Sequence, residues 1–152
     1  MEPNQDCFDF IKSHEGFSLT AYQDSAGIWT IGYGSILYTD YSHVKKGETI
    51  TQQLAEDLLA WEVSLKSKTV NSAVASVTLT QNQFNALVSF TYNVGIKALL
   101  CSTLLKRILA NPDDDTITDA FMMWDKAHEN GQLVVVDGLE NRRIDEAALY
   151  FS

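Results

Sequence analysis

Glu15, Asp24 and Thr30 are the residues of this sequence whose types and spacing could do chemistry together. Eight residues separate Glu15 from Asp24, and five separate Asp24 from Thr30. Two carboxyl groups across a cleft can break a glycosidic bond, because one protonates the leaving oxygen while the other activates a water or attacks the anomeric carbon. A hydroxyl such as that of Thr30 could hold the water in line. The chemistry that these three residues could support is therefore hydrolysis of a glycosidic bond.

The same residues also have an ordinary interpretation. Glu15 could be an exposed residue at a helix end, and Asp24 could be a simple turn former. The surrounding composition favours the catalytic interpretation, because glycines let backbone approach a flat sugar and aromatic rings can stack on it. The glycines and aromatic residues of this segment are Gly16, Gly27, Gly32, Gly34, Tyr22, Trp29 and Tyr33.

A short helix and a hairpin should position these residues. Apolar residues between positions 4 and 13 recur with helical offsets, which predicts a helix there. The helix should end near Gly16, which is suited to the left-handed position that closes a helix. The turn sequence of residues 24–27, followed by the β-branched and aromatic residues 28–31, predicts a hairpin or a small sheet.

The remainder of the chain is predicted to be mostly helical. Thr51 should open a helix, and Thr80 to Gln83 fits a capping box for the next one. Further helices are expected over residues 102–109, 116–126 and 137–151, the last with another capping pattern at residues 137–140. The predicted fold class is therefore α+β, with a small sheet near the N-terminus and a helical lobe behind it.

Length and composition fit one soluble globular domain over residues 1–152, since 45% of the residues are hydrophobic and 20% are charged. The net charge of -9 argues against nucleic acid as the principal partner. No apolar run is long enough to span a bilayer, and the N-terminus lacks a secretory signal, so we expect synthesis in a cytoplasm. Cys7 and Cys101 are expected to be free, buried thiols. No metal or other cofactor is expected.

Several segments together resemble a known family. The stretch EGFSLTAYQDSAGIWTIGYG closely resembles the N-terminal motif of the phage-type lysozymes, glycoside hydrolase family 24. The resemblance continues through TQNQFNALVSFTYNVG, STLLKRI, the surroundings of Trp124, and GLENRRIDEAALY. It covers nearly the whole chain in the family's order, so the motifs are highly specific in combination.

The resemblance implies a lysozyme-like fold and assigns roles to individual residues. Glu15 matches the catalytic acid of the family, Asp24 the second carboxylate, and Thr30 the hydroxyl that positions the attacking water. Arg142 resembles the arginine of the C-terminal helix that pairs with the catalytic glutamate, and Arg143 is the second choice. The implied reaction is hydrolysis between N-acetylmuramic acid and N-acetylglucosamine in peptidoglycan, with inversion as the expected course.

The family's fold also implies a cleft between two lobes of one domain. The β-rich lobe should span roughly residues 16–50, and the helical lobe residues 1–15 with 51–152. Ile36, Tyr92 and Thr103 fall where cleft residues of the family contact the sugar. For Ile36 and Tyr92, simple packing is an equally good interpretation.

The chain departs from the family in two ways: Ser35 stands where the family often has a histidine, and the chain is acidic where lysozymes are commonly basic. We expect an endolysin or a prophage-derived version of one. It should act as a monomer on peptidoglycan strands without stable membrane insertion, and reach the wall through a membrane lesion or a secretion apparatus. The alternatives are an antibacterial effector with the same chemistry, and a noncatalytic glycan-binding or virion structural protein. The intact Glu15, Asp24 and Thr30 count against the last.

Overall fold

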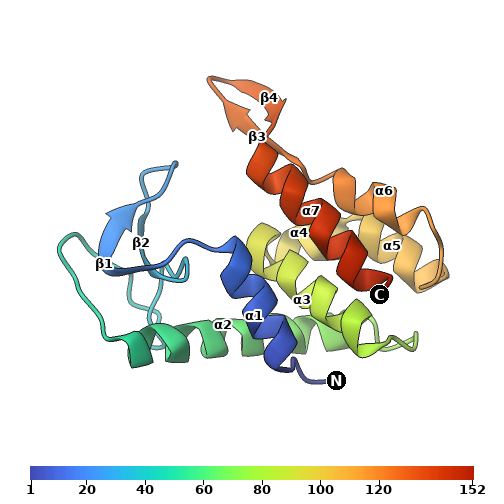
Figure 1. Cartoon of the computed structure of the whole chain (residues 1–152), viewed down its shortest axis with the longest axis horizontal. Coiled ribbons are helices and arrows are strands. Elements are labelled where there is room, and N and C mark those ends of the chain that lie inside the picture. Colours follow the sequence, from blue (N-terminus) through green and yellow to red (C-terminus); the bar gives the residue numbers. More distant parts are fainter. The chain divides into compact units, whose positions relative to one another are not determined.

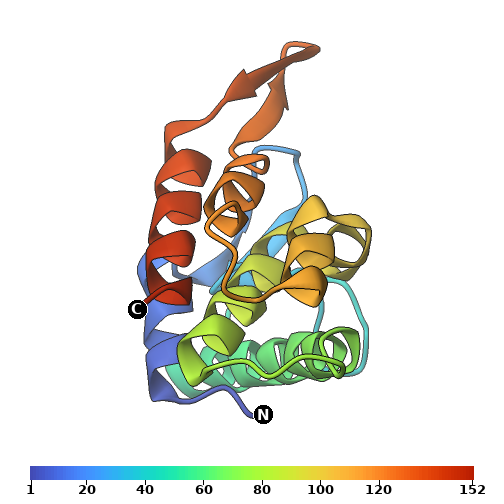
Figure 2. The ribbon, with the colours of Figure 1, turned by 90° about the vertical axis from the view of Figure 1, so that its right-hand side faces the viewer.

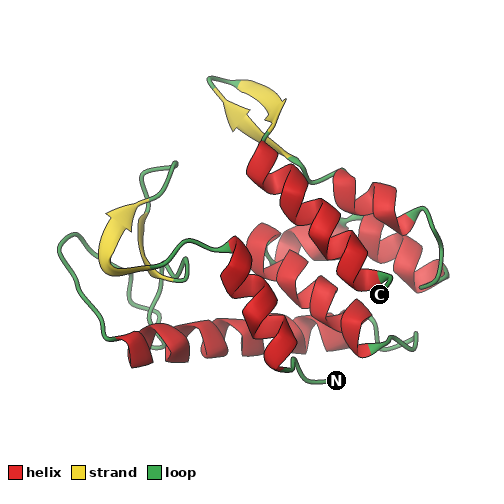
Figure 3. Cartoon of the chain, viewed as in Figure 1, coloured by secondary structure: helices red, strands yellow, loops and turns green.

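The structure, a computed structural model, describes residues 1–152 except for the side chain of Glu129. Most of the chain is helical, and two small antiparallel hairpins supply the strands (Figure 3). The elements in chain order are α1 (Gln5–His14), β1 (Ser18–Gln23), β2 (Trp29–Gly32), α2 (Gln52–Ala73), α3 (Gln81–Val94), α4 (Ile96–Cys101), α5 (Thr103–Ala110), α6 (Ile117–Met122), β3 (Lys126–Glu129), β4 (Gln132–Val135) and α7 (Asp137–Tyr150) (Figure 1).

The chain forms two compact units. One consists of residues 8–65, and the other of residues 1–7 with 66–152. Helices α1 and α2 each contribute residues to both units. The predicted β-rich segment, residues 16–50, lies within the unit formed by residues 8–65.

In the unit of residues 8–65, the predicted hairpin is confirmed. Strands β1 and β2 pair antiparallel, with Tyr22 opposite Thr30. Residues 48–50 extend the sheet at the other edge of β1, where Ile50 N–H donates to the Leu19 carbonyl oxygen at 2.9 Å. The core under this sheet consists of Ile31, Val44 and Leu58, with Ala21, Trp29, Tyr38 and Ile50 packed against it.

Gly32 at the end of β2 shows why this strand needs a glycine. Its φ of +63° lies in the left-handed region, which L side chains rarely adopt. A Cβ built on Gly32 would lie 3.4 Å from the Cβ of Ala55 on α2, an ordinary van der Waals contact, so the requirement for glycine comes from φ. Since Ala55 is fully buried, the end of the hairpin is packed directly onto this helix.

Helix α3 is the centre of the other unit, because its residues 83–91 are all buried. Its predicted capping box is confirmed: Thr80 accepts from the backbone N–H of Gln83, and the Gln83 side chain accepts from that of Thr80. Helix α7 packs along α3 and against α6 (Figure 2). The Phe90 ring of α3 makes an edge-on contact with Phe121 at 5.7 Å between ring centroids.

The predicted helix over residues 116–126 is wrong beyond Met122, where α6 ends. The chain turns and forms the β3–β4 hairpin, which projects beyond the N-terminal end of α7 (Figure 1). Asn130 and Gly131 at its tip have φ values of 50° and 80°. These are the conformations of a two-residue hairpin turn with positive φ at both positions, for which Asn-Gly is the favoured sequence.

Three other local expectations need correction. Gly16 does not have a positive φ, so it does not close α1 as predicted. Helix α7 begins after Val136 without a side-chain cap, so the capping pattern predicted at residues 137–140 is absent. The short helix α4 was not predicted, because its six residues carry little periodic signal.

Both cysteines are free, as predicted, but only Cys7 is buried. Burial raises the pKa of the Cys7 thiol to about 12. Cys101 is exposed because it is the last residue of α4, a helix whose buried residue is Leu99. Across the part of the chain that the structure describes, no helix combines the length and apolar character needed to cross a membrane.

Candidate active site

Glu15 directly follows α1, and its backbone N–H still donates to the Ile11 carbonyl oxygen at 3.1 Å. Ile11 is fully buried, so this last turn of the helix is anchored. The Glu15 carboxylate lies against the turn that follows β2. A Cβ built on Gly34 would be 3.4 Å from Glu15 Oε2, and Gly34 has a φ of +98°. The glycine predicted to allow close backbone approach therefore lies directly beside the predicted acid.

Asp24 is held by the backbone of the turn between β1 and β2. Its Oδ1 accepts the N–H of Ala26 at 2.8 Å and the N–H of Ile28 at 2.9 Å. Such an Asx turn fixes the orientation of the side chain. Since both hydrogen bonds use Oδ1, the second oxygen, Oδ2, is the one that can accept a hydrogen bond from a water or a sugar hydroxyl.

Thr30 is almost completely buried, with 4% of its surface exposed. Its hydroxyl donates to the Ile28 carbonyl oxygen at 3.0 Å. A hydroxyl that has given its one proton to a carbonyl can still accept a hydrogen bond. The hydroxyl oxygen of Thr30 can therefore accept a hydrogen bond from a water molecule.

Tyr22 connects the three predicted residues and was missed as a site residue in the sequence. It pairs directly with Thr30 across the hairpin, and its hydroxyl lies 3.9 Å from a Cβ built on Gly16, the neighbour of Glu15. The pKa of Tyr22 is raised, first by burial and then by the negative charges of Glu15 and Asp24. Both carboxylates therefore lie close enough to act on one phenol group.

A sequence signal for Tyr22 was available. Tyr22 lies in β1, only two residues before Asp24 of the following turn. Directly opposite residues of an antiparallel pair share a face. In the structure, Glu15 and Asp24 thus lie close enough to Tyr22 to act on it electrostatically, and Thr30 lies opposite Tyr22 on the neighbouring strand.

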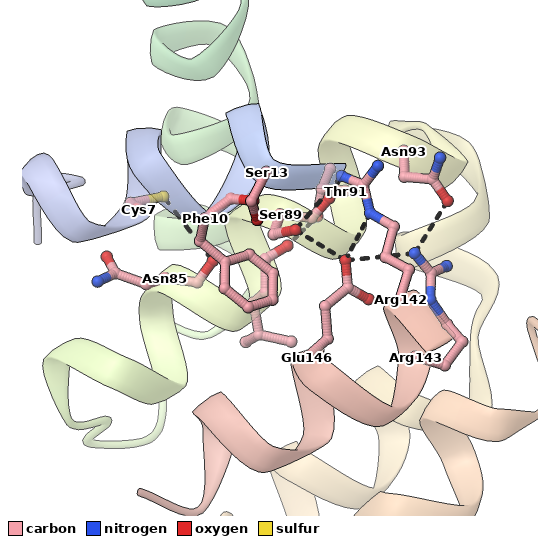
Figure 4. Close-up of polar contacts among 11 residues, drawn as sticks. Cys7, Phe10, Ser13, Asn85, Ser89, Thr91, Asn93, Arg142, Arg143 and Glu146 are labelled. Atoms are coloured by element: carbon pink, nitrogen blue, oxygen red, sulfur yellow. Dashed lines mark hydrogen bonds and ion pairs between the residues drawn. The ribbon is translucent and has the colours of Figure 1, made fainter. Parts of the chain in front are cut away.

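Arg142 and Arg143 lie in the other unit and are both buried, at 3% and 0% exposed. Each forms an ion pair with Glu146 on the same helix, from Arg142 Nε at 3.1 Å and Arg143 Nε at 2.9 Å (Figure 4). The predicted pairing of Arg142 with Glu15 stays a prediction.

The neighbouring helix α3 completes this buried network of charges. Ser89 Oγ donates to Glu146 Oε1 at 2.7 Å, and Arg143 Nη2 donates to Asn93 Oδ1 at 2.9 Å (Figure 4). The Arg143 guanidinium also lies over the Phe90 ring, 5.1 Å from its centroid. Buried charges are tolerated only when they are paired and hydrogen-bonded in this way. The network therefore joins α7 to α3.

The three predicted sugar-contacting residues are divided between the units. Ile36 belongs to residues 8–65, and Tyr92 and Thr103 to the other unit. Ile36 is 39% exposed, while its carbonyl oxygen accepts the Val44 N–H at 3.0 Å. Its backbone is thus fixed and its side chain partly faces solvent. Tyr92 near the end of α3 and Thr103 at the start of α5 are half-buried. Sugar contact by these residues stays a prediction.

Ser35, which stands where the family often has a histidine, is 1% exposed. Its backbone exchanges two hydrogen bonds of 2.9 Å with Ile31. The residue therefore closes the turn that carries Gly34. Among the described residues, its side-chain oxygen has no hydrogen-bond partner.

A small hairpin that carries Asp24, a preceding helix that ends directly before Glu15, and a larger helical unit define a lysozyme-like α+β fold. The phage lysozyme family matches residues 12–146, and the chain belongs to this family. It is 39% identical over 143 residues to an endolysin of Acyrthosiphon pisum secondary endosymbiont phage 1, covering 93% of this chain and 92% of that one.

Solved structures agree with this assignment. The endolysin from Escherichia coli O157:H7 phage FAHEc1 is 44% identical, with a TM-score of 0.91, covering 99% of this chain and 93% of that one. The muramidase domain of SpmX from Asticaccaulis excentricus is 34% identical, with a TM-score of 0.86, covering 99% and 98% of the two chains.

Proposed function

We propose that this protein is an endolysin-type muramidase. It hydrolyses the β-1,4 bond between N-acetylmuramic acid and N-acetylglucosamine in peptidoglycan and thereby causes bacterial lysis. The observation that carries the proposal is that one hairpin holds Asp24 and Thr30, both hydrogen-bonded to Ile28, while Glu15 lies beside Gly34 in the turn after the hairpin, in a member of the phage lysozyme family. The endolysin and muramidase names of its relatives support the same chemistry.

Glu15 is the proposed general acid. In its protonated form it would deliver a proton to the leaving glycosidic oxygen, a step that contributes about 10² to 10⁴ in rate. Its backbone is anchored at the end of α1, and its carboxyl group lies beside Gly34. Placement of this kind is what general acid catalysis requires, because the proton must be within hydrogen-bond reach of the leaving oxygen.

Asp24 and Thr30 are proposed to hold the attacking water. Asp24 Oδ2 and Thr30 Oγ1 can each accept one of its two protons in a hydrogen bond, which turns a lone pair of the water oxygen toward the anomeric carbon. Transfer of one proton to Asp24 as the carbon–oxygen bond forms gives inversion, the course we propose. Inverting enzymes hold their carboxyl groups about 6.5–9.5 Å apart to admit the water. Proton NMR of the first-formed reducing ends tests this proposal, because retention of the β anomer contradicts it.

The decisive experiment is the clearing of purified cell walls by the wild type and two variants. Glu15→Gln keeps the size of the side chain but cannot deliver the proton, so we expect a loss of about 10²-fold or more. Asp57→Asn is the control, because it removes a charge from an exposed side chain of α2 in the same unit. Normal clearing by a folded Glu15→Gln protein would overturn the assignment of the acid.

The route to the wall is part of the proposal. The protein would be made in the host cytoplasm and released through a membrane lesion, or exported by a secretion apparatus, and it would act on glycan strands as a monomer. A holin gene beside this gene supports the first route, and a secretion-system gene supports the second. Light scattering after size-exclusion chromatography tests the monomer.

A further inference from the structure

Glu56 of α2 gathers hydrogen bonds from three side chains. Lys12 of α1 forms an ion pair with its Oε2. Tyr33, in the turn after β2, donates its hydroxyl proton to Oε1 at 2.9 Å, and Gln52 Nε2 donates to the same oxygen at 2.9 Å. We call Lys12, Tyr33, Gln52 and Glu56 the Glu56 cluster. One carboxylate therefore joins α1, the glycine turn (residues 32–34) and α2 within the unit of residues 8–65.

The Tyr33 ring adds contacts to this cluster. Lys12 Nζ lies 5.3 Å from the ring centroid, a cation–π distance. The Phe17 ring packs against Tyr33 with 4.7 Å between centroids. Hydrogen bonding to Lys12 lowers the pKa of Glu56, and the same hydrogen bond raises the pKa of Lys12. Glu56 and Lys12 therefore both stay charged over a wide range of pH.

Two of the three segments that the cluster joins, α1 and the glycine turn, are the ones that position Glu15. Lys12 lies three residues before Glu15, one turn of helix earlier. Tyr33 lies directly between Gly32, which packs on Ala55, and Gly34, which lies beside the Glu15 carboxylate. A shift of either segment would change the distance between Glu15 and Gly34.

We propose that Glu56, acting through Lys12 and Tyr33, is a positioning residue for Glu15. Its carboxylate fixes the end of α1 relative to the glycine turn, and so fixes the direction in which Glu15 presents its proton. This inference rests on the proposed function, in which Glu15 is the general acid. Glu56 itself touches no reacting atom in this proposal.

The test uses Tyr33→Phe, which keeps the ring and its contacts with Lys12 and Phe17 but removes the hydroxyl. The matched control is Tyr38→Phe. The Tyr38 hydroxyl also donates to a glutamate of the same unit, Glu48 Oε2, at 2.9 Å, but this bond joins neither α1 nor the glycine turn. Both variants lose one tyrosine–carboxylate hydrogen bond, and Tyr33→Phe also loses the longer bond from Gln52 Nε2 at 3.3 Å, so its stability should fall by a similar or slightly larger amount.

Hydrolysis of soluble, uncrosslinked peptidoglycan strands separates kcat from KM. For Tyr33→Phe and for Glu56→Gln we expect kcat to fall about tenfold with KM nearly unchanged, because small misplacements of a reacting group are costly in rate. Tyr38→Phe should keep the wild-type kcat. The double variant with Tyr33→Phe and Glu56→Gln should lose little more kcat than the more affected of the two single variants, because the two residues act as one unit.

Four results would contradict either the positioning role of Glu56 or the proposed role of Glu15 as the acid. A wild-type kcat in folded Tyr33→Phe and Glu56→Gln proteins overturns the positioning role, as does an equal loss of kcat in Tyr38→Phe. A change confined to KM does the same, because it would assign the cluster to substrate binding. Activity of Glu15→Gln instead overturns the proposed acid, whatever Tyr33→Phe does. Chemical denaturation of each variant establishes that the compared proteins are folded.

Discussion

Asp24 and Thr30 hydrogen-bond to opposite ends of the same residue. The N–H of Ile28 donates to Asp24 Oδ1 at 2.9 Å, and its carbonyl oxygen accepts the Thr30 hydroxyl proton at 3.0 Å. The hairpin turn therefore sets the relative positions of the two proposed water ligands. Either side chain can be changed while the other keeps its own bond to Ile28.

This arrangement makes Thr30 a direct test of the water site. We expect Thr30→Val to lose about 10²-fold in wall clearing, because the water loses one of the two groups that orient it. Thr30→Ser keeps the hydroxyl and should stay within about tenfold of the wild type, since its freer rotation only weakens the orientation. Clearing rates of both folded variants check the prediction, and equal activity of the two would contradict it.

The contact between Gly34 and Glu15 predicts a second effect. Gly34→Ala places a methyl group against the Glu15 carboxylate, so we expect clearing to fall about 10²-fold. It also places a side chain at positive φ, which costs about 1–2 kcal/mol. Gly47→Ala is the control, because Gly47 has a φ of +82° and a Cβ built there would meet nothing within 4 Å.

Both glycine variants should therefore lose similar stability, measured by urea denaturation, while only Gly34→Ala loses activity. If Gly47→Ala loses as much activity as Gly34→Ala, backbone strain rather than contact with Glu15 explains the effect.

The buried charge network predicts a loss of stability. Replacing either Arg142 or Arg143 with alanine leaves part of the Glu146 charge uncompensated in the interior, which should cost about 3–5 kcal/mol in the free energy of unfolding. Chemical denaturation measures this cost for each variant.

Activity separates the two arginines. Clearing activity is compared under conditions in which both variants are folded. Arg142→Ala should then lose more activity than Arg143→Ala if Arg142 also pairs with Glu15, as the family resemblance implies. Wild-type activity in both variants would show that neither arginine of α7 has the role of pairing with Glu15 that the family resemblance implies.

The Glu56 cluster predicts a defined dependence of stability on pH. The pKa of Glu56 is lowered from its usual 4.5, chiefly by Lys12, so its contribution is fully present above about pH 4.5 and is lost as the pH falls through the folded-state pKa. The pKa of Lys12 is raised above 10.5, so its contribution is lost only in strong base.

The difference in unfolding free energy between the wild type and Glu56→Gln should therefore be constant near neutral pH and shrink below about pH 4.5. Urea denaturation from pH 7 to pH 3 measures it, with Asp57→Asn as the control for loss of one charge from α2. A difference that grows toward acid would show that the ion pair does not stabilise the fold.

The acidic charge predicts an unusual response to salt. A protein of net charge -9 should be repelled by an anionic wall. Screening shortens this repulsion from a range of about 30 Å at 0.01 M salt to about 10 Å at 0.1 M. We therefore expect clearing of purified walls to speed up over this range of sodium chloride. A steady fall in rate would instead indicate a local basic patch that attracts the wall.

Local signals in the sequence predicted the elements that position the candidate catalytic residues. The turn at residues 24–27 and the β-branched segment after it were sufficient for the β1–β2 hairpin, and Thr80 with Gln83 was sufficient for the start of α3. Thr51 also opens α2 as predicted, since Leu54 N–H donates to its hydroxyl. Each of these signals acts within a few residues.

The features that the sequence did not predict depend on contacts between distant segments, or lie where helix and hairpin signals compete. The Asn130-Gly131 turn marks a hairpin, but the helical pattern before it was extended too far. The role of Glu56 could not be read from the sequence, because Lys12, Tyr33 and Glu56 come from three separate segments. The burial of Arg142 and Arg143 was also unexpected, since arginine is almost never fully buried unless it is paired.

The Arg142–Arg143–Glu146 network also restricts how α7 can dock on α3. Sliding α7 by even one residue would move Arg143 away from Asn93 and Glu146 away from Ser89, and would leave charge unpaired in an apolar interior at a cost of several kcal/mol. Apolar contacts alone, such as those of Ala147 and Tyr150, discriminate less sharply between neighbouring alignments. The charged residues thus select a single register for the last helix, so its alignment on α3 does not depend on the apolar positions alone.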